Sequence, residues 1–161
     1  MKRSGYTLSE AMITVAIVGI LAAVGSPLLV KTTNFWRQTT ARNSIQRDVR
    51  ASLDIIDRFC RQAQAGTVVV DQVTGQPPFS RISFTSIQGQ QVSFYQSGNK
   101  LFMTLAGKQS VLSYNIAFIA FTYPRTDDTS IISVAITAQS PTYLGGTKAL
   151  QLSIQKVRIM N

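Results

Sequence analysis

The chain has 161 residues, with 16 Lys and Arg against 7 Asp and Glu, and a formal net charge of +9. Its hydrophobic share of 45% and charged share of 14% favour a folded core plus a membrane segment over disorder. It contains no histidine, which excludes Ser-His-Asp and Cys-His catalysis and the usual zinc sites. No P-loop or dinucleotide fingerprint occurs, so we expect no enzyme activity, no cofactor and no metal site.

The N-terminus combines a short basic leader with a long uncharged run. Met1-Lys2-Arg3 begins the chain, and residues 11–30 contain no charged side chain. A helix of about twenty residues spans about 30 Å, which matches the hydrocarbon core of a bilayer. Glu10 lies at the edge of this run, where a carboxylate is costly and usually functional. We therefore expect one membrane-spanning helix with a functional carboxylate at its start.

The residues between the leader and the apolar run form a motif, Gly5-Tyr6-Thr7-Leu8-Ser9-Glu10. It resembles the cleavage motif of type IV prepilins and type II secretion pseudopilins, in which Gly precedes the cut and Glu is the fifth mature residue. The resemblance implies that a prepilin peptidase cuts between Gly5 and Tyr6 and N-methylates Tyr6. It also implies that Glu10 directs assembly by pairing with the terminal amine of Tyr6 in an adjacent subunit. The alternative role for Glu10 is to cap its own helix, where negative charge is mildly favourable.

Two residues within the apolar run bear on the shape of the helix. Pro27 lacks an N–H and clashes with the preceding turn, so we expect a kink or a loosened helix around residues 23–27. Pilins of this family often carry Gly and Pro at the positions of Gly19 and Pro27, and the stretch between them is partly unwound in assembled filaments. Close packing of a neighbouring helix on Gly19 is the alternative, and both interpretations stay open.

The helix is expected to continue beyond Lys31 as an amphipathic segment and to stop near Gly66. The apolar residues that recur at spacings of three and four are Ile45, Val49, Leu53, Ile56 and Cys60. So long a helix needs a membrane or neighbouring subunits to hold its N-terminal half. Cys60 is the only cysteine, and its place on the apolar face favours a buried structural residue over a disulfide between chains.

After Gly66 the apolar residues alternate with polar ones, which predicts short strands with hairpin turns between some of them. The predicted strands lie around residues 82–84, 92–94, 101–105, 117–123, 132–138 and 150–159, with turns at 97–99 and 106–108 and loops at 75–78, 126–128 and 141–147. They imply an antiparallel sheet laid over the apolar face of the helix. The predicted fold is α+β and pilin-like. Its parts are a leader over 1–5, a membrane and assembly half of the helix over 6–30, an amphipathic half over 31–65, and a β-sheet domain over 66–161.

The order of the later strands resembles minor pilins and pseudopilins of the J / PilW-like kind. The matching features are an aromatic-rich strand over 118–123, the acidic pair Asp127-Asp128, an alternating strand over 132–138, and the end Val157-Arg158-Ile159-Met160-Asn161. This favours a minor subunit. Asp127 and Asp128 offer few of the roughly six to eight oxygen ligands that Ca²⁺ takes, so we interpret them as a solvated turn.

The positive charge suits nucleic acid, anionic lipid or acidic partner subunits. Loss of Lys2 and Arg3 with the leader would leave +7 from side chains (+9 minus two). Phe35 and Trp36 lie among the basic residues of the helix, a combination that also occurs in nucleic-acid-binding surfaces. A solvated face that meets neighbouring subunits or lipid headgroups is the favoured interpretation, and contact with nucleic acid stays open.

The sequence therefore predicts a non-enzymatic structural subunit of a type IV pilus, a type II secretion pseudopilus or a DNA-uptake filament. Its expected partners are the prepilin peptidase, other pilin or pseudopilin subunits and the inner-membrane assembly platform. It is expected to cross the inner membrane once, with its C-terminal domain outside the cytoplasm, before it enters an envelope or surface filament. The main alternative is a conventionally secreted β-rich binding protein with a signal peptide cut near Ser26. A membrane-anchored envelope enzyme is the least favoured reading.

Overall fold

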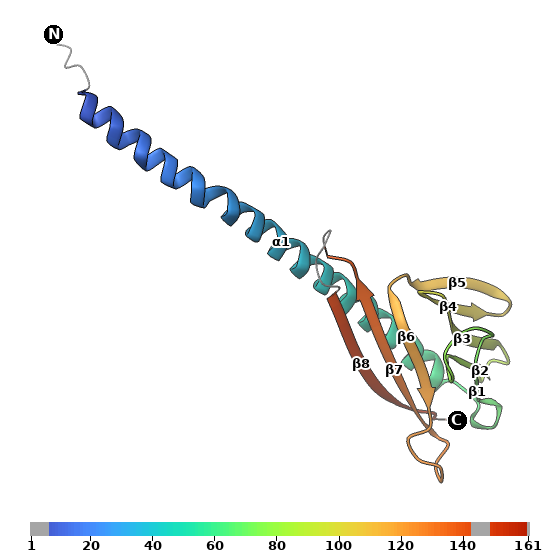
Figure 1. The fold of residues 1–161 in the computed structure, drawn as a ribbon. Coiled ribbons are helices and arrows are strands. Elements are labelled where there is room, and N and C mark those ends of the chain that lie inside the picture. Colours follow the sequence, from blue (N-terminus) through green and yellow to red (C-terminus); the bar gives the residue numbers. More distant parts are fainter. Residues whose placement is uncertain (1–6, 143–148, 161) are drawn as a thin grey trace.

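The structure, a computed structural model, describes residues 7–142 and 149–160 of the chain. A long helix carries a β domain on its C-terminal half, and its N-terminal half projects away from that domain (Figure 1). This arrangement confirms the α+β, pilin-like fold class. The elements in chain order are α1 (Leu8–Arg61), the short 3₁₀ helix η1 (Ala65–Thr67), β1 (Val69–Asp71), β2 (Arg81–Thr85), β3 (Gln91–Ser97), β4 (Lys100–Leu105), β5 (Lys108–Ser113), β6 (Ile116–Thr122), β7 (Ile131–Ser140) and β8 (Ala149–Arg158).

The two halves of α1 have different surroundings. The helix has 54 residues, which makes it about 80 Å long at 1.5 Å per residue. Its buried side chains all lie in the C-terminal half. They are the whole predicted stripe of Ile45, Val49, Leu53, Ile56 and Cys60, and in addition Ser52. β7 and β8 provide most of the sheet contact to α1, and β5 adds a smaller share. The spacing of the apolar residues therefore determined which face of the helix meets the domain.

The C-terminal end of α1 differs from the expected one. The helix ends at Arg61 instead of Ala65, and Gly66 lies inside η1. The Gln62 N–H bonds to the carbonyls of Phe59 and Cys60 and closes the last turn. The Gln64 N–H then donates to the Thr85 carbonyl at 2.9 Å. The helix stops early because its next residues pair with the end of β2, a tertiary contact that local sequence does not encode.

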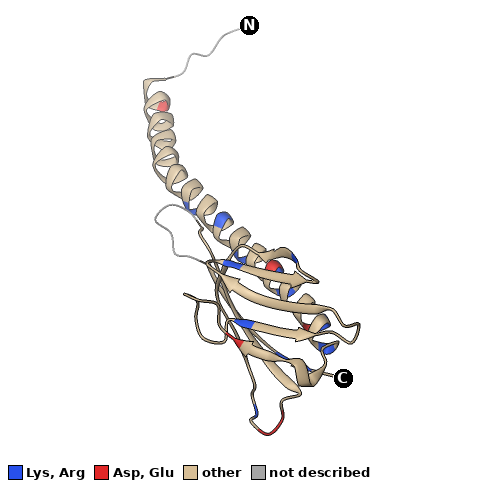
Figure 2. Ribbon diagram, turned by 90° about the vertical axis from the view of Figure 1, so that its right-hand side faces the viewer, with Lys and Arg blue, Asp and Glu red and all other residues tan. Residues whose placement is uncertain are grey.

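Pro27 does not interrupt the helix. α1 is helical at every residue from 23 to 27, so the expected loosening of this stretch is absent from the single chain. Figure 2 shows instead that the helix curves over its length. Pro27 removes one i→i−4 hydrogen bond, and the bonds of the adjoining turns persist. One missing bond bends a helix more readily than it unwinds it.

The β domain contains two antiparallel sheets, whereas the sequence pattern suggested a single one. β1 to β5 form one sheet in chain order, and β6, β7 and β8 form the other. The predicted hairpin turns are confirmed: Gly98 has φ +58° between β3 and β4, and Gly107 has φ +81° between β4 and β5. The strands β1 and β5 were not predicted, because β1 has three residues and the exposed half of β5 lacks apolar alternation.

Side-chain and loop contacts keep the two sheets separate at β6. The Ile119 N–H donates to Oε1 of the buried Gln96 on β3 at 3.0 Å. The Phe121 N–H donates to the Phe79 carbonyl at 2.8 Å. These acceptors satisfy the free edge of β6 without a continuous strand ladder to the first sheet. The core then forms where both sheets meet the buried face of α1, around Phe84, Phe94 and Phe121.

Candidate processing and assembly site

The candidate site begins at the N-terminal tip of α1. Gly5 and Tyr6, the predicted cleavage and methylation positions, lie outside the described residues. The described part of the motif starts at Thr7, which has an extended backbone and forms the N-cap of the helix. Within the described residues, the site therefore consists of Thr7 and Glu10.

Thr7 and Glu10 form a capping box. The Glu10 N–H donates to Thr7 Oγ1 at 3.4 Å. In return, Glu10 Oε2 accepts the Thr7 N–H at 2.8 Å and the Thr7 hydroxyl at 2.9 Å. Reciprocal bonds of this kind satisfy donors that a helix N-terminus otherwise leaves unpaired. In the single chain Glu10 thus has the capping role that sequence analysis considered as the alternative to assembly.

The cap leaves the Glu10 carboxylate available to a second partner. Both bonds that it accepts from Thr7 use Oε2, and the residue is exposed. The part played by Thr7 was not predicted. A Thr followed three residues later by Glu, just before an apolar run, is the sequence signature that would have found it.

The apolar half of α1 contacts nothing else in the described chain. Its most apolar 18-residue window has a mean hydropathy of 2.4 with none of the window buried, and α1 is the one candidate membrane-spanning helix among the described residues. Figure 2 shows this half free of charged residues after the acidic residue of its first turn. The large side chains that are at least half exposed are Leu8, Met12, Ile13, Val15, Ile17, Val18, Ile20, Leu21, Val24, Leu28, Leu29 and Val30.

Gly19 and Pro27 lie on this exposed half, apart from the cap. A Cβ added to Gly19 would meet no heavy atom within 4 Å, so nothing in the chain's own fold requires a small residue there. Pro27 lines a shallow apolar depression together with residues of the turns on either side, namely Ala23, Val24, Leu28 and Lys31. Any packing constraint at these two positions would have to come from a neighbouring helix or from lipid.

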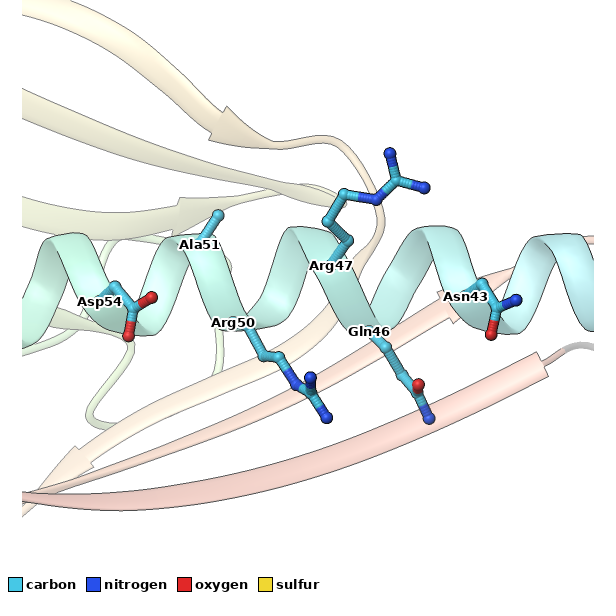
Figure 3. A pocket seen from close by; sticks show the side chains of 6 residues that line it. All are labelled: Asn43, Gln46, Arg47, Arg50, Ala51 and Asp54. Carbon is cyan, nitrogen blue, oxygen red and sulfur yellow. The ribbon is translucent and has the colours of Figure 1, made fainter.

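The basic surface predicted on the helix lies farther along α1. Figure 3 shows an open pocket on α1, where Arg50 and Gln46 point toward β8 and Arg47 points to the opposite side of the helix. The residues that line it are Asn43, Gln46, Arg47, Arg50, Ala51 and Asp54. Phe35 and Trp36 are 70% and 71% exposed. The pocket mixes cations, amides and a carboxylate, which suits polar protein contacts as well as nucleic acid.

The acidic loop offers little to a cation. Asp127 pairs with Arg125 at 3.4 Å, and Asp128 Oδ1 accepts the Ser130 N–H at 2.9 Å. The bonds from Ser130 lower the pKa of Asp128 below its usual range. Within 7–142 and 149–160, no group of three His, Cys, Asp or Glu side chains is placed to hold a metal ion. Asp127 and Asp128 thus contact Arg125 and Ser130, which are residues of the same loop.

Cys60 is buried, as predicted from its place on the helix. Burial, with a smaller contribution from Asp57, raises the pKa of its thiol to about 12. A thiol in that state is protonated at neutral pH and unreactive.

Comparison with known proteins identifies the N-terminal segment. Residues 1–26 match the family model of the prokaryotic N-terminal methylation motif. No curated protein and no solved structure matches the chain. The matched segment covers the basic N-terminal residues, the Gly5–Tyr6 bond, Thr7 and Glu10, and residues 11–26 of the apolar run. The chain therefore carries a prepilin-type methylation motif, and one long apolar helix and an antiparallel β domain follow it.

Proposed function

We propose that the chain is a minor pilin or pseudopilin, a non-enzymatic subunit of a type IV pilus, a type II secretion pseudopilus or a DNA-uptake filament. The observation that carries the proposal is the unbroken apolar helix, unburied within the chain, directly behind a methylation motif. So large an apolar surface requires lipid or the helices of other subunits to cover it. A pilin uses both in turn, lipid before assembly and neighbouring subunits afterwards.

Processing is the first step of the proposed function. A prepilin peptidase cuts after Gly5, where the missing side chain leaves room for close approach to the peptide bond. The same class of peptidase methylates the new amine of Tyr6. The subunit then waits in the inner membrane with the apolar half of α1 across the bilayer and the β domain outside the cytoplasm.

Glu10 has one role before assembly and another during it. In the single chain the capping box with Thr7 supplies hydrogen bonds to a carboxylate at the membrane edge, where an unsatisfied charge is unfavourable. In the filament the methylated amine of an adjacent Tyr6 neutralises it, and this pairing fixes the register of the incoming subunit. Gly19 and Pro27 bracket the stretch of α1 that loosens when neighbouring helices pack around it.

The first test is the N-terminal sequence and the intact mass of the protein from its native membrane. The proposal predicts a chain that starts at Tyr6 with one added methyl group. A chain that starts near Ser26 would replace it with a secreted protein cut by a signal peptidase. A chain that keeps Met1 in a host with an active prepilin peptidase would also refute it.

The second test separates the two roles of Glu10. Glu10→Gln removes the charge but keeps an oxygen that can accept from Thr7, since Gln also completes a capping box. Thr7→Ala removes the side chain of the cap and keeps the charge. We expect both variants to be cleaved, Glu10→Gln to be lost from filaments, and Thr7→Ala to be incorporated nearly normally. Equal incorporation of both variants would exclude the ion pair, and selective loss of Thr7→Ala would make the cap the essential feature.

A further inference from the structure

The outer face of β8 is apolar where a surface strand is normally polar. Leu150, Leu152 and Ile154 point away from α1 and are 60%, 61% and 63% exposed. The residues between them, Gln151, Ser153 and Gln155, face the helix, and Gln151 accepts a hydrogen bond from Gln46 at 3.3 Å. An apolar outer row combined with polar inner residues is the reverse of what folding of the single chain favours. Such a row indicates a surface that another molecule covers.

The apolar surface continues across the second sheet. Leu152 lies beside Thr137 of β7, and Thr137 lies beside Phe118 of β6, so these three residues form one row across the strands. Ile154, Ala135 and Ala120 form the next row in the same way. Side chains directly opposite on one face lie within about 5.5 Å of each other. The face is thus continuous and is built from small, aromatic and branched side chains.

Two cations border this face where β8 ends. Lys156 and Arg158 follow Ile154 on the same side of β8, and both are exposed. A second copy of the chain is poorly suited to meet them. The protein has 7 acidic residues against 16 basic ones, and three of those acids already pair with Arg of the same chain: Asp57, Asp71 and Asp127. The charge complement of this end is a partner that supplies carboxylates.

A lipid surface does not fit the position of the face. Gln151, near the start of β8, lies beside Gln46 of α1. Gln46 is 16 residues beyond Val30, the last residue of the apolar run. At 1.5 Å per residue that separation is about 24 Å along the helix. β8 then runs toward the C-terminal end of α1 (Figure 1), so Lys156 and Arg158, which follow the apolar residues along the strand, lie farther from the apolar half of α1. A membrane-bound surface would require the opposite order.

We propose that the outer face of the β6–β7–β8 sheet, centred on Leu150, Leu152 and Ile154 and bordered by Lys156 and Arg158, docks a different filament subunit that presents an apolar surface flanked by carboxylates. That the partner is a subunit of a filament rests on the proposed function. The chemistry of the surface rests on the strand register, exposure and charge alone. The contact would select between subunits during assembly, because the apolar rows supply contact area and the cations supply discrimination.

The test is photocrosslinking of the full chain in its native host. A benzophenone amino acid replaces Leu152, or replaces Ile87 as a matched control. Ile87 is 52% exposed on a turn of the other sheet. We expect an adduct from position 152 and none from position 87. Mass spectrometry of the adduct should identify one other protein, crosslinked at an apolar segment that has Asp or Glu beside it.

Charge reversal completes the test. Lys156→Glu combined with Arg158→Glu should reduce the adduct at least about tenfold, while Lys156→Arg should leave it unchanged. An adduct of twice the chain mass would assign the face to a second copy, and a lipid adduct would assign it to the membrane. Either result, the absence of an adduct, or an adduct insensitive to charge reversal would overturn the inference.

The same sample distinguishes this inference from the proposed function. A processed chain that begins at Tyr6 but gives no adduct would refute the docking surface alone. An adduct formed by a chain that is not cut after Gly5 would refute the pilin function and leave the surface chemistry standing.

Discussion

Replacement of Ile56 by Ala measures how firmly α1 holds the β domain. Ile56 is 0% exposed on the buried face of the helix, in the same core as Phe84 and Phe94. Removing its three outer carbons leaves a cavity among side chains held by two sheets, so we expect a loss of about 3 kcal/mol within the usual range of about 2 to 5 kcal/mol. With a urea m value of about 2 kcal/mol per molar, the unfolding midpoint falls by about 1.5 M.

The assay is urea unfolding of the full chain in detergent micelles, followed by far-ultraviolet circular dichroism. Ile13→Ala is the matched control, since Ile13 lies on the same helix, is 60% exposed and loses the same atoms. Both variants gain the same helix propensity, about 0.4 kcal/mol, so the difference between them reports tertiary packing. Should Ile56→Ala fail to fold, Ile56→Val should lower the midpoint by about 0.5 M. Equal shifts at positions 56 and 13 would refute the packing of α1 described above.

Three further results are expected, the first from the sequence motif and the other two from the structure. Gly5→Val should leave only uncleaved precursor on an immunoblot, and normal processing would exclude Gly5 as the cleavage position. Cys60 should react with a thiol reagent at pH 8 at least about 100-fold more slowly in the native chain than in denaturant, because its thiol is buried and its pKa is raised to about 12; fast native labelling would contradict its burial. Hydrogen bonds from Arg81 lower the pKa of Asp71, so the stabilisation from this pair is present above the ordinary carboxyl pKa and is lost as the pH falls through the lowered value. In Asp71→Asn the urea midpoint should therefore fall less in acid than it does in the unmodified chain. An unchanged pH profile would show that the pair does not contribute to the stability of the domain.

The sequence by itself determined the features that depend on local pattern. The uncharged run is enough to predict a helix long enough to cross a membrane. Gly5, Tyr6 and Glu10, directly before that run, predict the motif that the family comparison then matched. Apolar residues at spacings of three and four specify one face of a helix, because its period is 3.6 residues. Gly98 and Gly107 mark hairpin turns, since a positive φ is readily adopted only by glycine. In each case the physical cause acts within a few residues.

Tertiary contacts decided what the pattern left open. α1 ends at Arg61 because Gln64 bonds to Thr85 of a distant strand, and β6 stays apart from the first sheet because Gln96 satisfies its edge. The alternation of Leu150, Leu152 and Ile154 predicts a strand but not which side of it meets the core. Both faces of a strand have the same period, and a shift of one residue in register exchanges them. Pairing of β8 with β7 placed the apolar row outside, so only the folded chain shows that this row is exposed.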